Sequence, residues 1–232
     1  MNAEHTQEAL QPVQVSPELA KAYLNKVYLW MATTLVTAAA VAVATAHSVD
    51  TLTWVMQHQL MLCLFYIGTV VVMCFGSRAL PSGAMALLLL LFAGLSGLSF
   101  GPLLTLYTQQ SLGLTFGVTA GMFGAMSLYG ACTKRDLSAW GRTLMMLLFG
   151  LVLALVVNIF WGNGLMDLVC SAVGVVLFAL LTAYDTQKLL QEGLCEDEEL
   201  RRKGAILGAL TLYLDFINMF LFLLRFLGQQ RD

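Results

Sequence analysis

Charged residues are scarce in this sequence. Asp, Glu, Lys and Arg make up only 11% of its 232 residues, whereas a soluble domain carries about 25%. The formal net charge is −2 and no basic stripe runs outside the short polar connections, which argues against a nucleic-acid partner. With 59% hydrophobic residues, the composition instead predicts a membrane protein whose main partner is the lipid bilayer.

The sequence also lacks the clustered ligands of a metal or redox site. Its five cysteines lie far apart and form no CxxC pair, so we interpret them as small hydrophobic residues. His5, His47 and His58 fall in the polar start of the chain, in a connection and at a helix end. They lack the additional His, Asp or Glu ligands that a zinc hydrolase needs, and no cofactor is predicted.

The start of the chain has neither the basic first residues nor the apolar run of a signal peptide. Its first twenty residues are polar and contain two prolines. We interpret residues 1–22 as a mobile cytoplasmic tail. Residues 23–232 then form a single transmembrane domain.

Seven apolar segments are long enough to cross a bilayer, which takes about 20 residues in a helix. They are residues 27–46, 55–75, 83–107, 112–132, 143–161, 165–184 (with a continuation to about 190) and 205–227. The sequence therefore predicts an all-α membrane protein with seven transmembrane helices, and the short connections predict that neighbouring helices are antiparallel.

Basic residues predict the orientation of these helices. They occur before the first segment and in alternate connections: Lys21, Lys26, Arg78, Lys134, Arg135, Arg142, Lys188, Arg201, Arg202 and Lys203. Because basic residues stay on the cytoplasmic side, the N-terminus is predicted to be cytoplasmic. Seven crossings then place the C-terminus outside, which Arg225 and Arg231 oppose. A last helix that stops short or re-enters would remove this conflict.

Two pairs of glycines have the GxxxG spacing that lets membrane helices approach closely. Gly97 and Gly101 lie in the third segment, and Gly117 and Gly121 lie in the fourth. We expect both pairs to pack against helices of the same chain, and treat a dimer contact as the alternative.

Two carboxylates lie in the last two apolar segments, away from the connections. They are Asp185 and Asp215. A charged side chain at the centre of a bilayer costs about 2.5–3.5 kcal/mol even on lenient scales. Asp215 should therefore face the interior of the bundle. This predicts that the seventh helix is central and is surrounded by the first six.

Helical periodicity places each aspartate on a stripe of small or polar residues. These stripes consist of Ser171, Gly174, Phe178, Thr182 and Asp185 in the sixth segment, and of Gly208, Thr211, Asp215 and Asn218 in the seventh. Asp215 lies about 15 Å into its helix, at about 1.5 Å per residue. The two aspartates can meet only if the sixth helix extends beyond Tyr184 or the seventh begins inside a cytoplasmic cavity.

Two neighbouring carboxylates do not ionise independently, and they titrate as a unit. A shared proton would close the pair through a hydrogen bond, and its loss would leave a site for a hard cation. Thr182, Thr211 and Asn218 are candidate hydrogen-bonding partners. The other interpretation is that Asp215 only fixes helix packing.

Four stretches resemble the Bax inhibitor-1 family of transmembrane proteins, in particular its bacterial inner-membrane members. They are AGMFGAMSLYG (120–130), TKRDLS (133–138), LTAYDTQKL (181–189) and GALTLYLDFINMFLFLLRF (208–226). The resemblance implies seven helices with the last at the centre. It also implies a pH-sensitive calcium leak controlled by an aspartate pair, here Asp185 and Asp215, which would bind calcium transiently.

The resemblance further suggests a latch between an arginine near the second helix and the aspartate of the sixth. Arg78 is the candidate in this sequence, and the other interpretation is an interfacial basic residue. The resemblance also allows a second function, in which the chain regulates another membrane protein such as a quality-control protease.

An intramembrane aspartyl protease is the enzyme class closest to the aspartate pattern. AYDTQ around Asp185 fits its first motif, but LYLDFIN around Asp215 lacks the glycines of the second. We therefore predict that the chain is not an enzyme.

Overall fold

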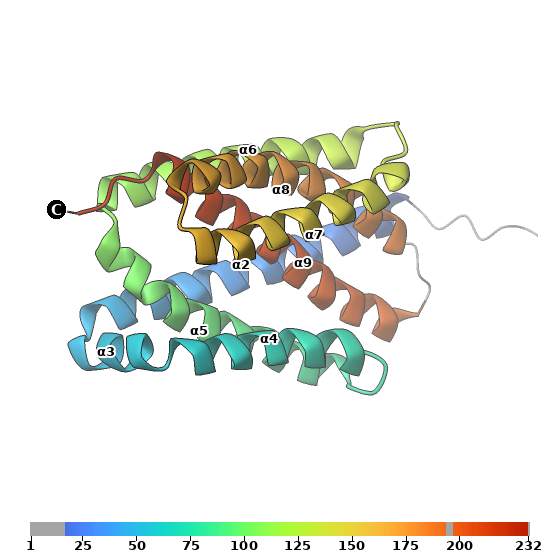
Figure 1. Cartoon of the computed structure of the whole chain (residues 1–232). Helices are drawn as coiled ribbons and strands as arrows, with labels where there is room; N and C mark the ends of the chain where they lie inside the picture. The colour runs from blue at the N-terminus through green and yellow to red at the C-terminus, as the bar shows by residue number, and fades with distance from the viewer. Residues whose placement is uncertain (1–16, 194–196, 232) are drawn as a thin grey trace, which may run out of the picture.

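The computed structural model describes residues 17–193 and 197–231, and these ranges form helices without a β-strand. The helices are α2 (Pro17–His47), α3 (Val49–Gln57), α4 (Gln59–Gly76), α5 (Ser82–Leu106), α6 (Gln109–Cys132), α7 (Ser138–Trp161), α8 (Gly164–Glu192) and α9 (Glu198–Leu227). All except α3 are long and apolar enough to cross a membrane. This confirms the prediction of an all-α membrane protein with seven spans (Figure 1).

Two of the helix boundaries differ from the prediction. The first helix begins at Pro17, so residues 17–22 of the predicted tail are helical, and residues 1–16 lie outside the described ranges. This early start is stabilised by packing, because Tyr23 is 4% exposed and its ring lies against Gly193 and Gly204. The second predicted span is divided at His58 into α3 and α4.

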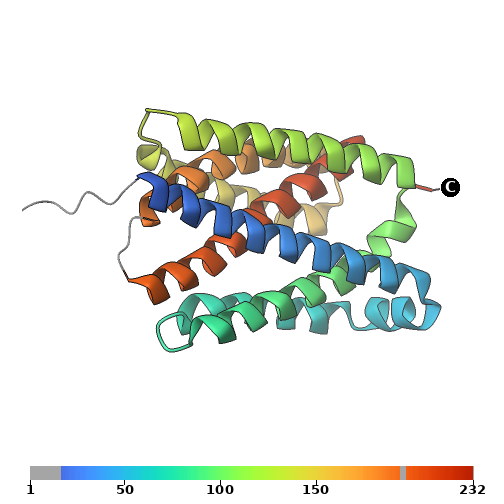
Figure 2. The same ribbon diagram turned by 180° about the vertical axis from the view of Figure 1, so that it is seen from behind.

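Helix α9 lies at the centre of the bundle, as predicted. Of the residues in its most apolar stretch 61% are buried, against 39% or less in the other six spans. It packs against α2, α5, α6 and α8, whereas α4 and α7 pack mainly on α5 and α8. In Figures 1 and 2 it crosses the bundle diagonally between these neighbours. The central helix therefore has protein around most of its length.

Helix α9 crosses the whole bundle and neither stops short nor re-enters. Its first turn lies beside the start of α5, where Glu199 accepts hydrogen bonds from the backbone N–H and the hydroxyl of Ser82. Beyond its last turn, Gln230 forms a β-bridge with Tyr107 in the α5–α6 connection. The start of α2 and the C-terminus thus lie at opposite ends of the bundle (Figure 1).

An ion pair accounts for one of the basic residues at the C-terminal end of the bundle. Arg225 Nη1 lies 3.2 Å from Asp167 Oδ1 in the first turn of α8. The basic charge that opposed the predicted orientation therefore has an acidic partner at the same end.

The two glycine pairs behave differently. A Cβ on Gly97 would come within 2.5 Å of the carbonyl oxygen of Ala38, and a Cβ on Gly101 would overlap Thr45, so this pair packs closely on α2 as expected. Gly117 and Gly121 have no atom within 4 Å of an added Cβ. The prediction that this second pair packs inside the chain is therefore wrong.

Candidate functional site

The level at which α8 and α9 meet is fixed by glycine contacts along both helices. Gly208 of α9 accommodates Leu189 of α8, and Gly174 of α8 accommodates the ring of Phe222. Helix α8 extends past Tyr184 to Glu192, while the first turns of α9 reach beyond the end of α8. This antiparallel register brings Asp185 and Asp215 to the same level. Of the two possibilities given by the sequence, extension of the sixth helix beyond Tyr184 is the one observed.

The carboxyl groups of Asp185 and Asp215 lie close enough to interact directly. Asp215 is 5% exposed and its Oδ2 atom is buried, with no hydrogen-bond donor among the neighbouring described residues. A hydrogen bond between two carboxyl groups requires that one of them carries the proton. A proton shared between buried Asp215 and half-buried Asp185 would supply the donor that the surrounding protein does not.

A cavity of about 340 Å³ reaches Asp185 from the end of the bundle where α2 begins. Helices α4, α8 and α9 enclose it, and its polar lining includes Asp185, Lys188, Glu192 and Thr211. Lys188 interacts electrostatically with Asp185 and also forms an ion pair of 3.7 Å with Glu192. Asp185 is thus accessible from a cavity whose lining is mostly apolar but includes charged residues, while Asp215 lies behind it in the core.

The three candidate supporting side chains do not hydrogen-bond to either carboxyl group. Thr182, Thr211 and Asn218 each donate to the backbone carbonyl four residues earlier in their own helix. Thr211 lines the cavity. Thr182 lies three residues before Asp185 in α8 and is fully buried. Their polar groups are satisfied locally, so the structure does not bring them to the pair as partners.

Arg78 does not reach the aspartate pair in this conformation. It lies exposed in the turn between α4 and α5 and forms no ion pair with the described residues. The basic side chain that interacts with Asp185 is Lys188, on the same helix. The structure therefore does not engage Arg78 as a latch.

Helix α6 carries a buried stripe of hydroxyl groups that the sequence interpretation missed. Ser111, Thr115, Thr119 and Ser127 recur at intervals of four or eight residues and are all buried. The hydroxyls of Thr115 and Ser127 have no hydrogen-bond partner among the described residues. Spacing by four residues was visible in the sequence and could have identified this stripe.

Phe123 occupies the missing position in that stripe. Its ring packs edge-on against Phe216, with the ring centres 5.6 Å apart. Phe216 directly follows Asp215 in α9. An aromatic contact therefore separates the aspartate level from the hydroxyls of Thr119, Thr115 and Ser111 nearer to the C-terminal end.

The loop between α6 and α7 is attached to the helix that carries Asp185. Gln187 accepts a hydrogen bond of 2.8 Å from the Leu137 N–H and donates one of 2.8 Å to the Arg135 carbonyl. In the last turns of α6, just before this loop, Gly130 lies directly against the backbone of Ala183. These contacts give the TKRDLS and LTAYDTQKL stretches a shared structural role in positioning α8.

The aspartate pair alone offers fewer ligands than a resident calcium ion takes. Ca²⁺ takes six to eight oxygen ligands, and two carboxyl groups supply four oxygen atoms at most. The described residues contain no group of three or more His, Cys, Asp or Glu side chains that could hold a metal ion. A cation at the pair would therefore keep part of its hydration shell, which the adjoining cavity has room to contain.

Comparison with known proteins gives one consistent result. The family described as "Inhibitor of apoptosis-promoting Bax1" matches residues 20–232. The inner membrane protein YbhL of Escherichia coli is 42% identical over 215 residues, which cover 90% of this chain and 92% of that protein. An uncharacterised protein of Deinococcus radiodurans is 40% identical over 220 residues, covering 94% of this chain and 95% of the relative. With its seven spans and central last helix, the chain belongs to the Bax inhibitor-1 family.

Proposed function

We propose that this protein is a pH-sensitive leak channel for Ca²⁺, or for cations more generally, in the bacterial inner membrane. The observation that carries the proposal is the direct approach of Asp185 to Asp215 beside a cavity that Lys188 and Glu192 also line. Ionisable residues within membranes are costly and mark ion pathways and proton relays. A pair that only fixed helix packing would not need a cavity with charged residues against one of its members.

The proton on the pair is the proposed sensor. With the proton present, the two carboxyl groups are joined and carry a single negative charge. When the proton leaves, two negative charges face each other, and a hard cation that binds between them relieves their repulsion. Protons and Ca²⁺ then compete for the same oxygen atoms, so proton concentration controls the occupancy of the pathway.

The stripe on α6 is the proposed continuation of the pathway. Hydroxyl oxygens can replace part of a hydration shell in a pore, and Thr119, Thr115 and Ser111 lead from the middle of the bundle to its C-terminal end. The contact between Phe123 and Phe216 interrupts this route. We assign it as the constriction that is closed in this conformation.

The orientation is proposed from the distribution of basic residues. Under the positive-inside rule the start of α2 and the cavity beside Asp185 face the cytoplasm. YbhL is named an inner membrane protein, and we propose the same membrane for this chain. Asp167 and Arg225 then lie at the outer surface.

The glycine pair on α6 favours a second candidate function, regulation of another membrane protein. Gly117 and Gly121 are exposed on the lipid-facing side and contact no helix of the described chain. Small residues on an exposed helix permit close contact with a partner helix. Co-purification with a membrane partner that is lost in Gly117→Leu, without any change in ion flux, would favour this candidate.

The leak is tested with purified protein in liposomes that contain a calcium-sensitive dye. Calcium flux measured across a series of pH values should vary with pH in the wild type and become flat in Asp185→Asn and Asp215→Asn. Asp167→Asn is the matched control, because Asp167 is a carboxylate on the same helix as Asp185 but pairs with Arg225 at the opposite end of the bundle. An unchanged pH profile in both aspartate variants would remove the gating proposal.

A further inference from the structure

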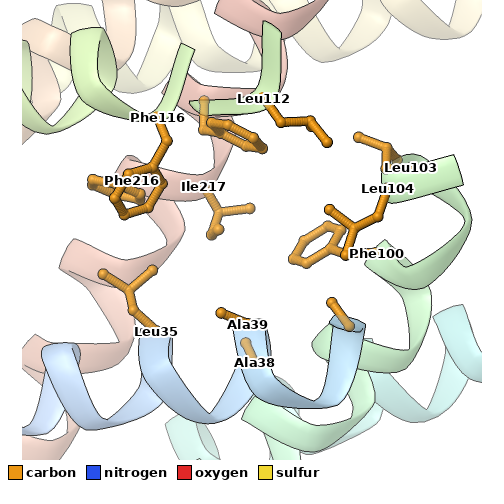
Figure 3. A pocket seen from close by; sticks show the side chains of 12 residues that line it. Leu35, Ala38, Ala39, Phe100, Leu103, Leu104, Leu112, Phe116, Phe216 and Ile217 are labelled. Atoms are coloured by element: carbon orange, nitrogen blue, oxygen red, sulfur yellow. The ribbon is translucent and has the colours of Figure 1, made fainter. Parts of the chain in front are cut away.

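A second cavity lies on the other side of α9, in the half of the bundle that contains the C-terminus. It has a volume of about 210 Å³ and twelve lining residues, all of them Leu, Ala, Phe or Ile. Figure 3 shows side chains of α2, α5, α6 and α9 arranged around it, with Ala38 and Ala39 on one side and Phe116 and Phe216 on another. No lining residue offers a polar side chain.

The cavity lies between two helices that flank α9 without forming a packed pair. Helix α2 packs against α5 and α9, and α6 packs against α8 and α9. Residues on the outer faces of both helices are exposed, including Val36 at 69% and Leu114 at 64%. Phe116 is itself 50% exposed and contacts both Phe216 and Phe220. The cavity is thus continuous with the surface that faces the bilayer.

The size and chemistry of the cavity select an apolar occupant. An apolar cavity of about 150 Å³ stays dry and binds benzene, and this one is larger. Along α2 its lining extends from Leu35 to Ala42, which is about 10 Å at about 1.5 Å per residue. That shape accepts a chain of methylene groups lying along the membrane normal.

We infer that this cavity is a binding site for one acyl chain of a bilayer lipid, which enters between α2 and α6 and contacts Ile217 and Phe220 of α9. The surrounding medium supplies acyl chains, and the cavity offers nothing that would hold a headgroup, water or an ion. Phe216 lines this cavity and also contacts Phe123, but the inference does not depend on the proposed calcium leak, because lipid labelling of the cavity requires no ion flux.

The test uses proteoliposomes of phosphatidylethanolamine and phosphatidylglycerol with a photoactivatable diazirine in the acyl chain. After illumination, mass spectrometry maps the labelled residues. Label on Ile217, Phe220 or Phe100 is expected in the wild type, in addition to the lipid-facing Val36. Label confined to lipid-facing residues such as Val36 overturns the inference.

Matched substitutions on α2 identify the site. Ala39→Phe fills the cavity and should reduce the label on Ile217 and Phe220 severalfold, whereas Ala40→Phe faces lipid beside it and should leave the label unchanged. Equal labelling in the two variants contradicts the inference. Phe220→Ala widens the cavity and should retain or increase the label on Ile217, so a decisive result remains if Ala39→Phe fails to fold.

Discussion

Gly130 of α6 lies so close to Ala183 of α8 that an added Cβ would overlap the Ala183 carbonyl group. The contact is with backbone rather than with a flexible side chain, so it cannot be relieved by a rotamer change. Ala183 is two residues from Asp185, and the packing of α6 therefore sets the position of one member of the aspartate pair.

Gly130→Ala should separate α6 from α8 and destabilise the protein by about 1–3 kcal/mol, the usual cost of overpacking. Thermal unfolding in detergent measures the effect. Gly124→Ala is the control, because a Cβ on Gly124 meets nothing within 4 Å on the same helix. Equal unfolding temperatures for the two variants would show that the α6–α8 contact is not tight.

Calcium binding should release protons from the aspartate pair. Since the same oxygen atoms bind either species, raising the pH should strengthen Ca²⁺ binding and raising Ca²⁺ should expel the proton. Asp215→Asn should bind Ca²⁺ more weakly and release no proton, because the amide cannot ionise. Titration calorimetry in two buffers of different ionisation enthalpy measures this release, and a variant that released as many protons as the wild type would contradict the assignment.

Cys74 should report water in the cavity beside Asp185. Cys74 and Cys63 are both exposed on α4, but only Cys74 lines that cavity. A charged, membrane-impermeant thiol reagent should therefore label Cys74 and leave Cys63 unlabelled in proteoliposomes. Single-cysteine variants with mass-spectrometric readout separate the two sites, and labelling of Cys63 alone would place water on the wrong face of α4.

Phe123→Leu should raise the cation leak severalfold at every pH. The smaller side chain opens the contact with Phe216 but leaves the proton-binding pair intact, so the ratio of flux between high and low pH should persist. Phe149→Leu, at a lipid-facing position of α7 that is 67% exposed, is the control. A leak that stays at the wild-type level in Phe123→Leu would place the constriction elsewhere.

The spans were predictable because continuous apolar runs are the strongest signal a membrane sequence carries. The residues at which the helices begin and end were harder to predict. Residues 17–22 look polar in isolation, and their helical structure depends on the packing of Tyr23 against residues near the start of α9. The break at His58 has no proline or glycine beside it, so nothing local marked it.

The pairing of Asp185 with Asp215 followed from helical periodicity together with the cost of a carboxylate in lipid. The expected hydrogen-bonding partners of the pair were not predicted correctly. Thr182, Thr211 and Asn218 bond to their own helices, which is the local competition that these residue types offer in apolar surroundings. The position of Arg78 depends on the α4–α5 turn, which periodicity within a helix cannot place.

The central position of α9 has a consequence for biogenesis. Helices are synthesised in chain order, so the six earlier spans enter the membrane before the surface on which α2, α5, α6 and α8 pack exists. Until α9 is inserted, the hydroxyl stripe of α6 and Gly174 of α8, which accommodates Phe222, lack the helix that packs against them. Assembly of the bundle is therefore a late event, completed by the insertion of a single segment that carries its own buried acid.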